Sequence, residues 1–231
     1  MVADPDSTII QAYGVLNPEA AGMQKGFARP GYFFIDSTGV IREKFFEPKY
    51  RERLTGNGLI TKLFPELGQE VTDTVEAAHL QLDLEQSDRS GVPGTRITLA
   101  VVVRLPQDVH VYAPGAQGYK PIKLSLDPLA ELDFRPAMYP ASKVLYLPVI
   151  NERVPAFEGT FGISQDVRVS SSSEFWGSLG TDGKTFGITG KLEYQACDKT
   201  KCYLPASVPV KWQLQVFPLD RNRAPLEIRH K

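Results

Sequence analysis

The sequence predicts a mainly β protein in which a sandwich of short strands follows a smaller α/β segment. Two observations support this. From residue 78 onward, apolar and polar residues alternate in short segments, and turns rich in Gly and Pro separate these segments without a long helical pattern between them. The 231 residues are 42% hydrophobic and 23% charged, which is the composition of an ordinary folded protein of one or two domains.

Residues 1–65 differ in pattern from the rest of the chain. Ser7–Gly14 predicts a short helix with a serine cap and a glycine stop. Residues 29–46 predict two strands joined by a tight turn, in which Gly39 supplies the positive φ. Tyr50–Phe64 has apolar residues at helical spacing, so a second helix is expected there.

The strands of the sandwich follow a polar stretch at residues 66–75, which we interpret as a linker. The sandwich itself is expected over residues 76–218, with a C-terminal tail at 219–231. A turn is expected at 87–94 and a loop at the serine tract 170–173. Strands are predicted at residues 79–85, 96–104, 109–112, 122–126, 142–150, 160–169, 185–194 and 208–217.

Both cysteines of the chain, Cys197 and Cys202, lie between the last two predicted strands. The four polar residues between them can close a hairpin-like loop that brings the two Cα atoms within the range of a disulfide. Such a short ring contributes only about 2 kcal/mol of stabilisation in the chain-entropy model. The fold therefore does not depend on this disulfide for its stability. We interpret the cysteine pair instead as a site of thiol-disulfide exchange. A structural disulfide in an exported protein remains the alternative.

A zinc site is a weaker interpretation of the same cysteines. The chain has no second cysteine pair, and its histidines are scattered at His79, His110 and His230, so four ligands are hard to assemble. We therefore expect neither a metal nor another cofactor.

Several residues near the cysteines are candidates for the site. His110 and Tyr112 lie two apart, hence on one face of a strand, and could polarise the cysteine pair or accept its proton; ordinary core packing is the alternative. Tyr203 directly follows Cys202, where it could shape the access of a partner. Lys199 and Lys201 favour a thiolate electrostatically, whereas Asp198 opposes it.

Composition and motifs exclude several classes of function. The net charge of −1 and the absence of a basic stripe argue against nucleic-acid binding, and no apolar run approaches the roughly 18 residues of a membrane span. The sequence has no Gly-rich phosphate loop and no nucleophile elbow. Residues 1–5 lack the features of a signal peptide, so an exported protein requires a signal that was removed or lies upstream.

The run from Tyr194 to Asp198, followed by Cys202-Tyr-Leu-Pro205, resembles the N-terminal periplasmic domain of the thiol:disulfide interchange protein DsbD and its disulfide bond corrector relatives. The similarity extends to residues 110–126 and 134–149. It implies an immunoglobulin-like sandwich, a periplasmic or otherwise exported location, and thioredoxin-like partners that exchange electrons with a Cys197/Cys202 pair. It also implies that a cap loop with Met138 and Tyr139 shields the pair, and weakly favours Cys202 as the cysteine that meets partners.

The order of elements in residues 1–65 is similar to the C-terminal half of a thioredoxin or AhpC/TSA-type peroxiredoxin domain, with Pro30 at the position of the cis-proline of that superfamily. No cysteine precedes residue 197, so we predict no peroxidase chemistry from this segment. A half-domain leaves strand edges unpaired, so self-association or contact with the sandwich is expected. Two alternatives to the exchange function remain: an immunoglobulin-like binding module, and a fragment of a larger peroxiredoxin-like enzyme.

Overall fold

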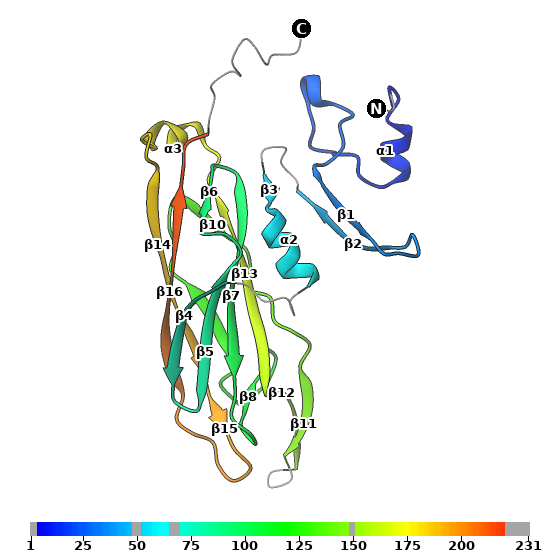
Figure 1. Ribbon diagram of the computed structural model, residues 1–231. Coiled ribbons are helices and arrows are strands. Elements are labelled where there is room, and N and C mark those ends of the chain that lie inside the picture. Colours follow the sequence, from blue (N-terminus) through cyan, green and yellow to red (C-terminus); the bar gives the residue numbers. More distant parts are fainter. Residues whose placement is uncertain (1–3, 48–51, 65–69, 148–150, 220–231) are drawn as a thin grey trace.

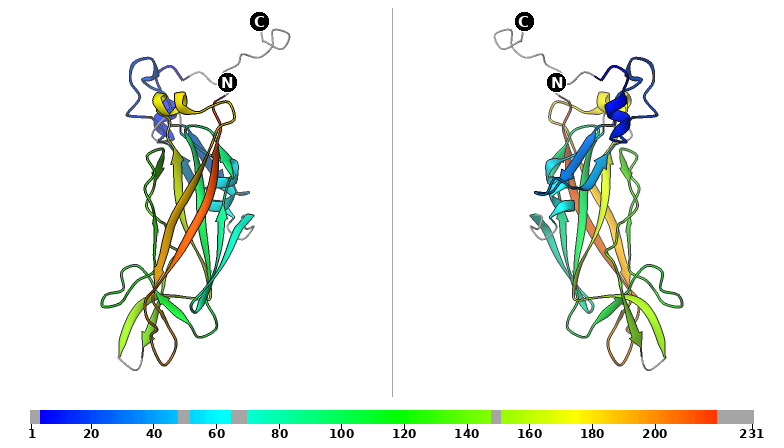
Figure 2. Two further views of the ribbon diagram at one scale, coloured as in Figure 1. Left: turned by 90° about the vertical axis from the view of Figure 1, so that its left-hand side faces the viewer. Right: turned by 90° about the vertical axis from the view of Figure 1, so that its right-hand side faces the viewer.

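A computed structural model describes residues 4–47, 52–64, 70–147 and 151–219 of the chain. The predicted mainly β sandwich is confirmed. Figure 1 shows an elongated stack of strands, with the N-terminal segment beside its upper end. The two turned views of Figure 2 show the layers of the sandwich edge on and the long strands running its whole length.

Three sheets build the sandwich. The largest has the strand order β10-β13-β7-β5-β4, with β3 paired to β7, and the sheet β6-β16-β14-β9 packs against it. The third sheet, β11-β12-β8-β15, lies at the lower end in Figure 1. The strands are β3 Arg53–Leu54, β4 Glu70–Ala77, β5 Leu80–Gln86, β6 Ser90–Gly91, β7 Thr95–Arg104, β8 His110–Tyr112, β9 Lys123–Leu126, β10 Leu132–Phe134, β11 Lys143–Leu147, β12 Glu152–Glu158, β13 Thr160–Val169, β14 Lys184–Tyr194, β15 Ala196–Cys197 and β16 Ala206–Val216.

The core lies between the first two sheets. Alternate residues of β16 point inward, among them Trp212, which is 1% exposed and whose indole N–H donates to the carbonyl oxygen of Glu85 at 3.0 Å. Strand β7 is buried on both faces, because Leu99 faces the core while Thr98 and Ala100 face outward beneath other parts of the chain. Burial on both faces explains why the middle of β7 is a continuous run of apolar residues.

The N-terminal segment contains helix α1 (Thr8–Ala12), a 3-10 turn (Gly22–Gln24) and an antiparallel hairpin of β1 (Gly31–Ile35) and β2 (Ile41–Phe46). The predicted hairpin is confirmed, and Gly39 has a φ of 83° in its turn. The predicted serine cap is wrong: Ser7 makes no side-chain cap bond, and the carboxylate of Asp4 accepts from the backbone N–H of Ile10 instead. The Pro30 peptide bond is trans, unlike the expected cis-proline.

The predicted helix at 50–64 is shorter than expected. Helix α2 spans Gly56–Leu63, and its N-cap is Thr55, whose hydroxyl accepts from the N–H of Gly58 at 2.9 Å. Residues 53–54 form β3, which pairs in parallel with β7, and residues 50–51 lie outside the described ranges. The cap at Thr55 and the two early glycines place the start of the helix after the strand rather than before it.

Charged side chains fix the end of this segment on the outer face of the largest sheet. Glu47 is 3% exposed and pairs with the Arg96 guanidinium through contacts of 2.7 and 3.2 Å. Glu52, which is 1% exposed, pairs with Arg168 of β13. Lys62 of α2 lies 3.0 Å from Asp166, also on β13. Glu47, Glu52 and Lys62 are therefore joined to the sandwich by partly buried ion pairs.

Three further expectations need correction. Residues 70–75 are not a linker, because they belong to β4, which pairs antiparallel with β5; residues 66–69 lie outside the described ranges. The loop expected at residues 170–173 is confirmed for 170–172, whereas Ser173 begins helix α3 (Ser173–Ser178), whose N-cap is Ser172. Strand β12 at residues 152–158, which contains Pro155 and lies between β11 and β8, is not among the predicted strands.

Candidate functional site

The two cysteines form a disulfide at the lower end of the sandwich, as their spacing predicts. Strand β15 ends at Cys197 and pairs antiparallel with β8, which places Cys197 opposite His110. The Cα atoms of Cys197 and Cys202 are 4.0 Å apart, and the backbone N–H of Asp198 donates to the carbonyl oxygen of Lys201 at 2.9 Å. The inter-cysteine loop is therefore a closed turn held to the third sheet at one end.

Asp198 organises this turn from within. Its carboxylate accepts hydrogen bonds from the backbone N–H groups of Thr200 and Lys201 at 2.7 and 2.9 Å, and from the hydroxyl groups of Thr200 and Tyr203 at 2.7 and 2.6 Å. The bond from Tyr203, followed by those from Thr200 and Lys201, lowers the pKa of Asp198 well below its ordinary value. The negatively charged carboxylate thus stabilises the loop by accepting its hydrogen bonds.

The two cysteines are unequally exposed. Cys197 is 1% exposed, whereas Cys202 is an exposed residue. The Tyr112 hydroxyl lies 3.3 Å from each of the two sulfur atoms. Because the sulfurs of a disulfide carry no hydrogen, the phenol is the donor to them. Burial raises the pKa of Tyr112, so this donor stays protonated at neutral pH.

His110 lies beside Tyr112 on β8, with the two rings edge to face and their centroids 5.6 Å apart. It is 6% exposed, and its Nε2 has no hydrogen-bond partner within the described part of the chain. Burial lowers the pKa of His110, while the charges of Glu158 and Asp198 oppose this shift. The imidazole is therefore neutral at pH 7.

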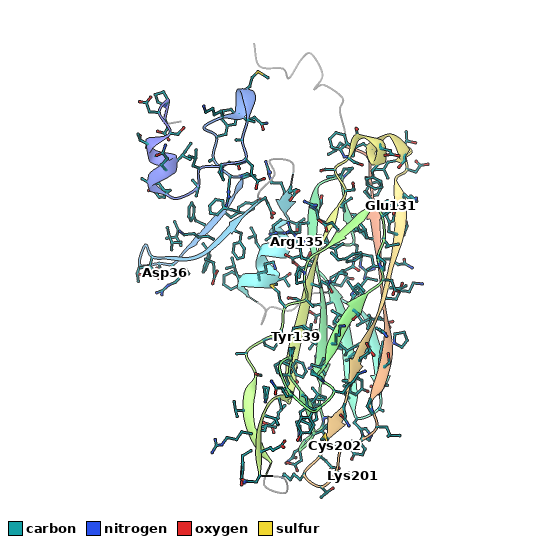
Figure 3. The ribbon with its side chains drawn as sticks, turned by 180° about the vertical axis from the view of Figure 1, so that it is seen from behind. Asp36, Glu131, Arg135, Tyr139, Lys201 and Cys202 are labelled. Atoms are coloured by element: carbon teal, nitrogen blue, oxygen red, sulfur yellow. A yellow bond between two sulfur atoms is a disulfide. The ribbon has the colours of Figure 1, made fainter. Side chains whose placement is uncertain are left out.

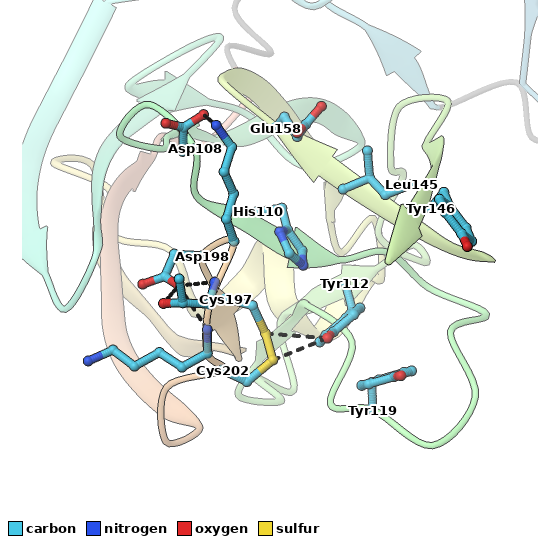
Figure 4. A pocket seen from close by; sticks show the side chains of 13 residues that line it. Asp108, His110, Tyr112, Tyr119, Leu145, Tyr146, Glu158, Cys197, Asp198 and Cys202 are labelled. Atoms are coloured by element: carbon cyan, nitrogen blue, oxygen red, sulfur yellow. Dashed lines mark hydrogen bonds and ion pairs between the residues drawn. A yellow bond between two sulfur atoms is a disulfide. The ribbon is translucent and has the colours of Figure 1, made fainter. Parts of the chain in front are cut away.

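A pocket of about 660 Å³ opens beside the disulfide. Figure 4 shows the disulfide and the inter-cysteine loop on one side of it, His110 and Tyr112 at its centre, and an aromatic wall on the other side. That wall consists of the rings of Tyr119 and Tyr146 together with the aliphatic side chain of Leu145, and we call these three residues the aromatic wall. The volume is within the range of pockets that bind small molecules, roughly 300–1,000 Å³.

Sequence reasoning missed this aromatic wall. Tyr119 belongs to the loop between β8 and β9, and Leu145 and Tyr146 belong to the edge strand β11. Only the pairing of β8 with both β12 and β15 brings these residues opposite the cysteines. One local feature of the sequence could have indicated this wall: Tyr119 follows His110 and Tyr112 within a few residues.

Tyr203 lies behind the loop rather than in the pocket. Its ring stacks on His79 with centroids 3.6 Å apart and an interplanar angle of 19°, and the Lys201 ammonium lies 5.1 Å from its centroid. Because its hydroxyl also donates to Asp198, Tyr203 supports the loop from its far side.

Met138 and Tyr139 are not placed over the disulfide, which corrects the expected cap. The backbone of Met138 exchanges hydrogen bonds with Ser164 of β13 at 2.7 and 3.0 Å, and the Tyr139 hydroxyl accepts from the N–H of Leu124 at 3.1 Å. Both residues line a different pocket, of about 600 Å³, on the outer face of the largest sheet. Figure 3 shows Tyr139 far above Cys202. Pairing with β13 holds this segment away from the cysteines.

Two kinds of feature are absent from the residues that the structure describes. Across these parts of the chain, no three His, Cys, Asp or Glu side chains gather as a group that could hold a metal ion. None of the helices described above is long and apolar enough to cross a membrane.

Comparison with known proteins gives distant structural similarities. No protein-family model and no curated protein matches the sequence. The N-terminal periplasmic domain of ScsB from Proteus mirabilis is similar with a TM-score of 0.43 and 9% identity, over 62% of this chain and 51% of that chain. This chain thus spans about half the length of that domain. The reduced DsbD N-terminal domain of Neisseria meningitidis is similar with a TM-score of 0.33 and 15% identity, over 49% and 74% of the two chains. The GAE domain of GGA2p from Saccharomyces cerevisiae has a TM-score of 0.34 and 10% identity, over 61% and 93%.

Proposed function

We propose that the chain is a thiol-disulfide exchange module that passes electrons through Cys197 and Cys202. The observation that carries this proposal is the asymmetry of the pair: Cys202 is exposed at a pocket, and Cys197 is buried against the Tyr112 hydroxyl. A disulfide that only braces the fold needs neither an exposed cysteine nor a hydroxyl donor in contact with its sulfurs.

The reaction begins when the thiolate of a thioredoxin-like partner attacks the Sγ atom of Cys202. A bond forms between the partner's sulfur and Cys202, the Cys197–Cys202 bond breaks, and Cys197 leaves with the electron pair as a thiolate. A second thiol of the partner then attacks the partner's sulfur and expels Cys202. The partner departs with a new disulfide, and the module keeps two electrons and takes up two protons.

The electrons leave the module by the reverse sequence. The Cys202 thiolate attacks a disulfide of an oxidised protein and forms a mixed disulfide. The Cys197 thiolate then attacks Cys202, restores the internal disulfide and releases the reduced protein. No oxidant or reductant beyond the two partner proteins is required.

Two neighbours of the disulfide have roles in this scheme. Tyr112 donates a hydrogen bond to the Cys197 thiolate as it forms, because its hydroxyl already lies 3.3 Å from that sulfur. His110, neutral at pH 7 and lining the same pocket, is available to accept the proton of an incoming thiol.

The class of partner and the location are part of this proposal. The motif around the cysteines resembles a family whose partners are thioredoxin-like and whose members are exported, and an oxidising compartment is where a disulfide persists. Met138 and Tyr139 have no place in the reaction, because they line the other pocket.

The first test is the reduction potential of the Cys197–Cys202 pair, measured by titration against a glutathione redox buffer with alkylated thiols counted by mass. We expect a value above about −300 mV and rapid exchange with thioredoxin. A value well below that, with slow reduction of the folded protein, would make the disulfide structural.

Two cysteine variants test the direction of attack. Cys197→Ala keeps the exposed thiol. It should accumulate a mixed disulfide with a thioredoxin-like partner whose resolving cysteine is replaced and whose remaining cysteine is activated as a disulfide with a small aromatic thiol, because that thiol leaves and neither protein has a second cysteine to resolve the product. Cys202→Ala keeps only the buried thiol and should accumulate none. The opposite pattern would contradict the assignment of Cys202.

One observation favours a second candidate, an immunoglobulin-like binding module with a structural disulfide. The inter-cysteine loop is tied down by four hydrogen bonds to Asp198 and by an ion pair of 2.6 Å between Lys199 and Asp108. Such a rigid loop could display a binding surface. A disulfide that resists mild reductants would support this function.

A further inference from the structure

We infer that the pocket beside the disulfide is a specificity site that receives a large aromatic side chain next to the reactive cysteine of the partner. This inference rests on the proposed exchange function and adds to it the kind of partner that the site selects. It concerns the aromatic wall of Tyr119, Leu145 and Tyr146, which takes no part in the chemistry proposed above.

Position is the first argument. The pocket of about 660 Å³ is lined by Cys202 itself, so a partner whose sulfur reaches Cys202 must bring its neighbouring residues to the mouth of this space. In Figure 4, Tyr119 and Tyr146 lie on the opposite side of the space from the disulfide, and Tyr112 lies between. An adjacent side chain of the partner is therefore the group best placed to enter.

The chemistry of the wall is the second argument. The hydroxyl of Tyr119 donates to Glu152 at 2.5 Å, that of Tyr146 donates to Asn151 at 3.1 Å, and that of Tyr112 is directed at the sulfurs. The Tyr112 and Tyr119 rings also stack on each other with centroids 4.2 Å apart. With the polar ends of all three phenols engaged, the uncovered ring surfaces and the Leu145 side chain form the apolar part of the pocket that an occupant can contact. Such surfaces favour an aromatic group over a polar one.

The charged groups of the loop support the same choice. Lys199 is paired with Asp108 at 2.6 Å, and Asp198 is used by its own turn. An apolar occupant disturbs neither set of contacts. Tyr146 is 53% exposed at the edge of the third sheet, and exposed aromatic side chains of this kind are enriched at protein interfaces.

The test uses two peptide thiols that differ only in the residues beside the cysteine, Trp-Cys-Trp and Ala-Cys-Ala. The rate of mixed-disulfide formation with the oxidised protein is measured for each and divided by its rate with a small aromatic disulfide, which corrects for intrinsic thiol reactivity. We expect the Trp peptide to react about tenfold faster than the Ala peptide.

Variants then locate the preference. Tyr119→Ala combined with Tyr146→Ala should reduce the ratio to near one. Val144→Ala is the matched control, because Val144 is a 66% exposed apolar residue of the same strand that does not line the pocket, and it should keep the ratio. A preference that persists in the double variant would overturn the inference.

The wild-type comparison decides the inference even if the double variant folds poorly. Equal corrected rates for the two peptides would overturn the aromatic subsite and leave the exchange function standing. Failure of both peptides, and of thioredoxin, to react would overturn the exchange function together with the inference.

Discussion

The hydroxyl of Tyr112 lies 3.3 Å from the Sγ atom of Cys197, at the buried end of a disulfide whose other sulfur belongs to an exposed residue. The pairing of β8 with β15 fixes this relationship, because it places the two strands that carry these residues side by side. In the proposed exchange, this hydrogen-bond donor contacts the sulfur that leaves as a thiolate, and it lies equally close to the Sγ atom of Cys202.

Tyr112→Phe is expected to slow thiol-disulfide exchange by about 10- to 100-fold, because a hydrogen bond to a charged group contributes roughly 1.5–3 kcal/mol. The measurement is the rate of reduction by thioredoxin. Tyr139→Phe is the control: its hydroxyl accepts from the N–H of Leu124 in the other pocket rather than contacting sulfur, so the rate should not change. An unchanged rate in Tyr112→Phe would remove the phenol from the mechanism.

Asp198→Asn is expected to destabilise the inter-cysteine loop at neutral pH and to accelerate amide hydrogen exchange at residues 198–203. Because hydrogen bonds lower the pKa of Asp198 in the folded protein, its contribution to stability is present above the ordinary value of 3.8 and is lost as the pH falls through the lowered value. The stability difference between wild type and variant should therefore shrink in strong acid.

The control for that experiment is Asp108→Asn, which removes only the exposed ion pair with Lys199. It should leave hydrogen exchange in residues 198–203 nearly unchanged, since exposed ion pairs contribute little. Equal protection of the loop in Asp198→Asn and wild type would refute the role of the turn.

Arg96→Met is expected to destabilise the protein by about 3–5 kcal/mol at pH 7, because it leaves the buried carboxylate of Glu47 without its partner. Burial raises the pKa of Glu47, so the folded protein binds its proton more tightly than the unfolded chain does. The burial of Glu47 is therefore tolerated at low pH and becomes destabilising as the pH rises through its folded pKa.

Denaturant unfolding of wild type and Arg96→Met at pH 4 and pH 7 checks this pH dependence. The free energy of unfolding that the variant loses relative to wild type should be smaller at pH 4. Arg89→Met serves as control, because Arg89 and Glu70 form an exposed pair with side chains 62% and 66% accessible. Its effect should stay within about 1 kcal/mol at both pH values. A larger loss at pH 4 than at pH 7 in Arg96→Met would contradict the assignment.

The N-terminal hairpin is expected to mediate self-association. Its sheet has two strands, and Tyr32, Ile35 and Val40 are exposed on it. The weight-average mass from light scattering should rise with protein concentration, and Ile35→Lys should weaken this rise. Val144→Lys, a change at an exposed apolar residue far from the hairpin, should not. A strict monomer over the whole concentration range would exclude self-association.

The sequence by itself determined the strands in which apolar and polar residues alternate clearly, such as β5 and β16. It also determined the disulfide between Cys197 and Cys202. Each follows from a local cause: the two-residue period of a half-buried strand, or a loop too short to keep two cysteines apart. The hairpin of β1 and β2 followed in the same way, because Gly39 permits its turn.

Only the tertiary structure decided what surrounds the disulfide. β4 escaped sequence reasoning because it is an edge strand with mostly exposed residues, which leaves little apolar alternation to detect. Tyr119 and Tyr146 line the pocket beside the cysteines, whereas Met138 and Tyr139 line a different pocket. Strand pairings between segments that are distant in sequence fix these positions. Such pairings depend on the packing of the whole sandwich, which no local pattern of residues encodes.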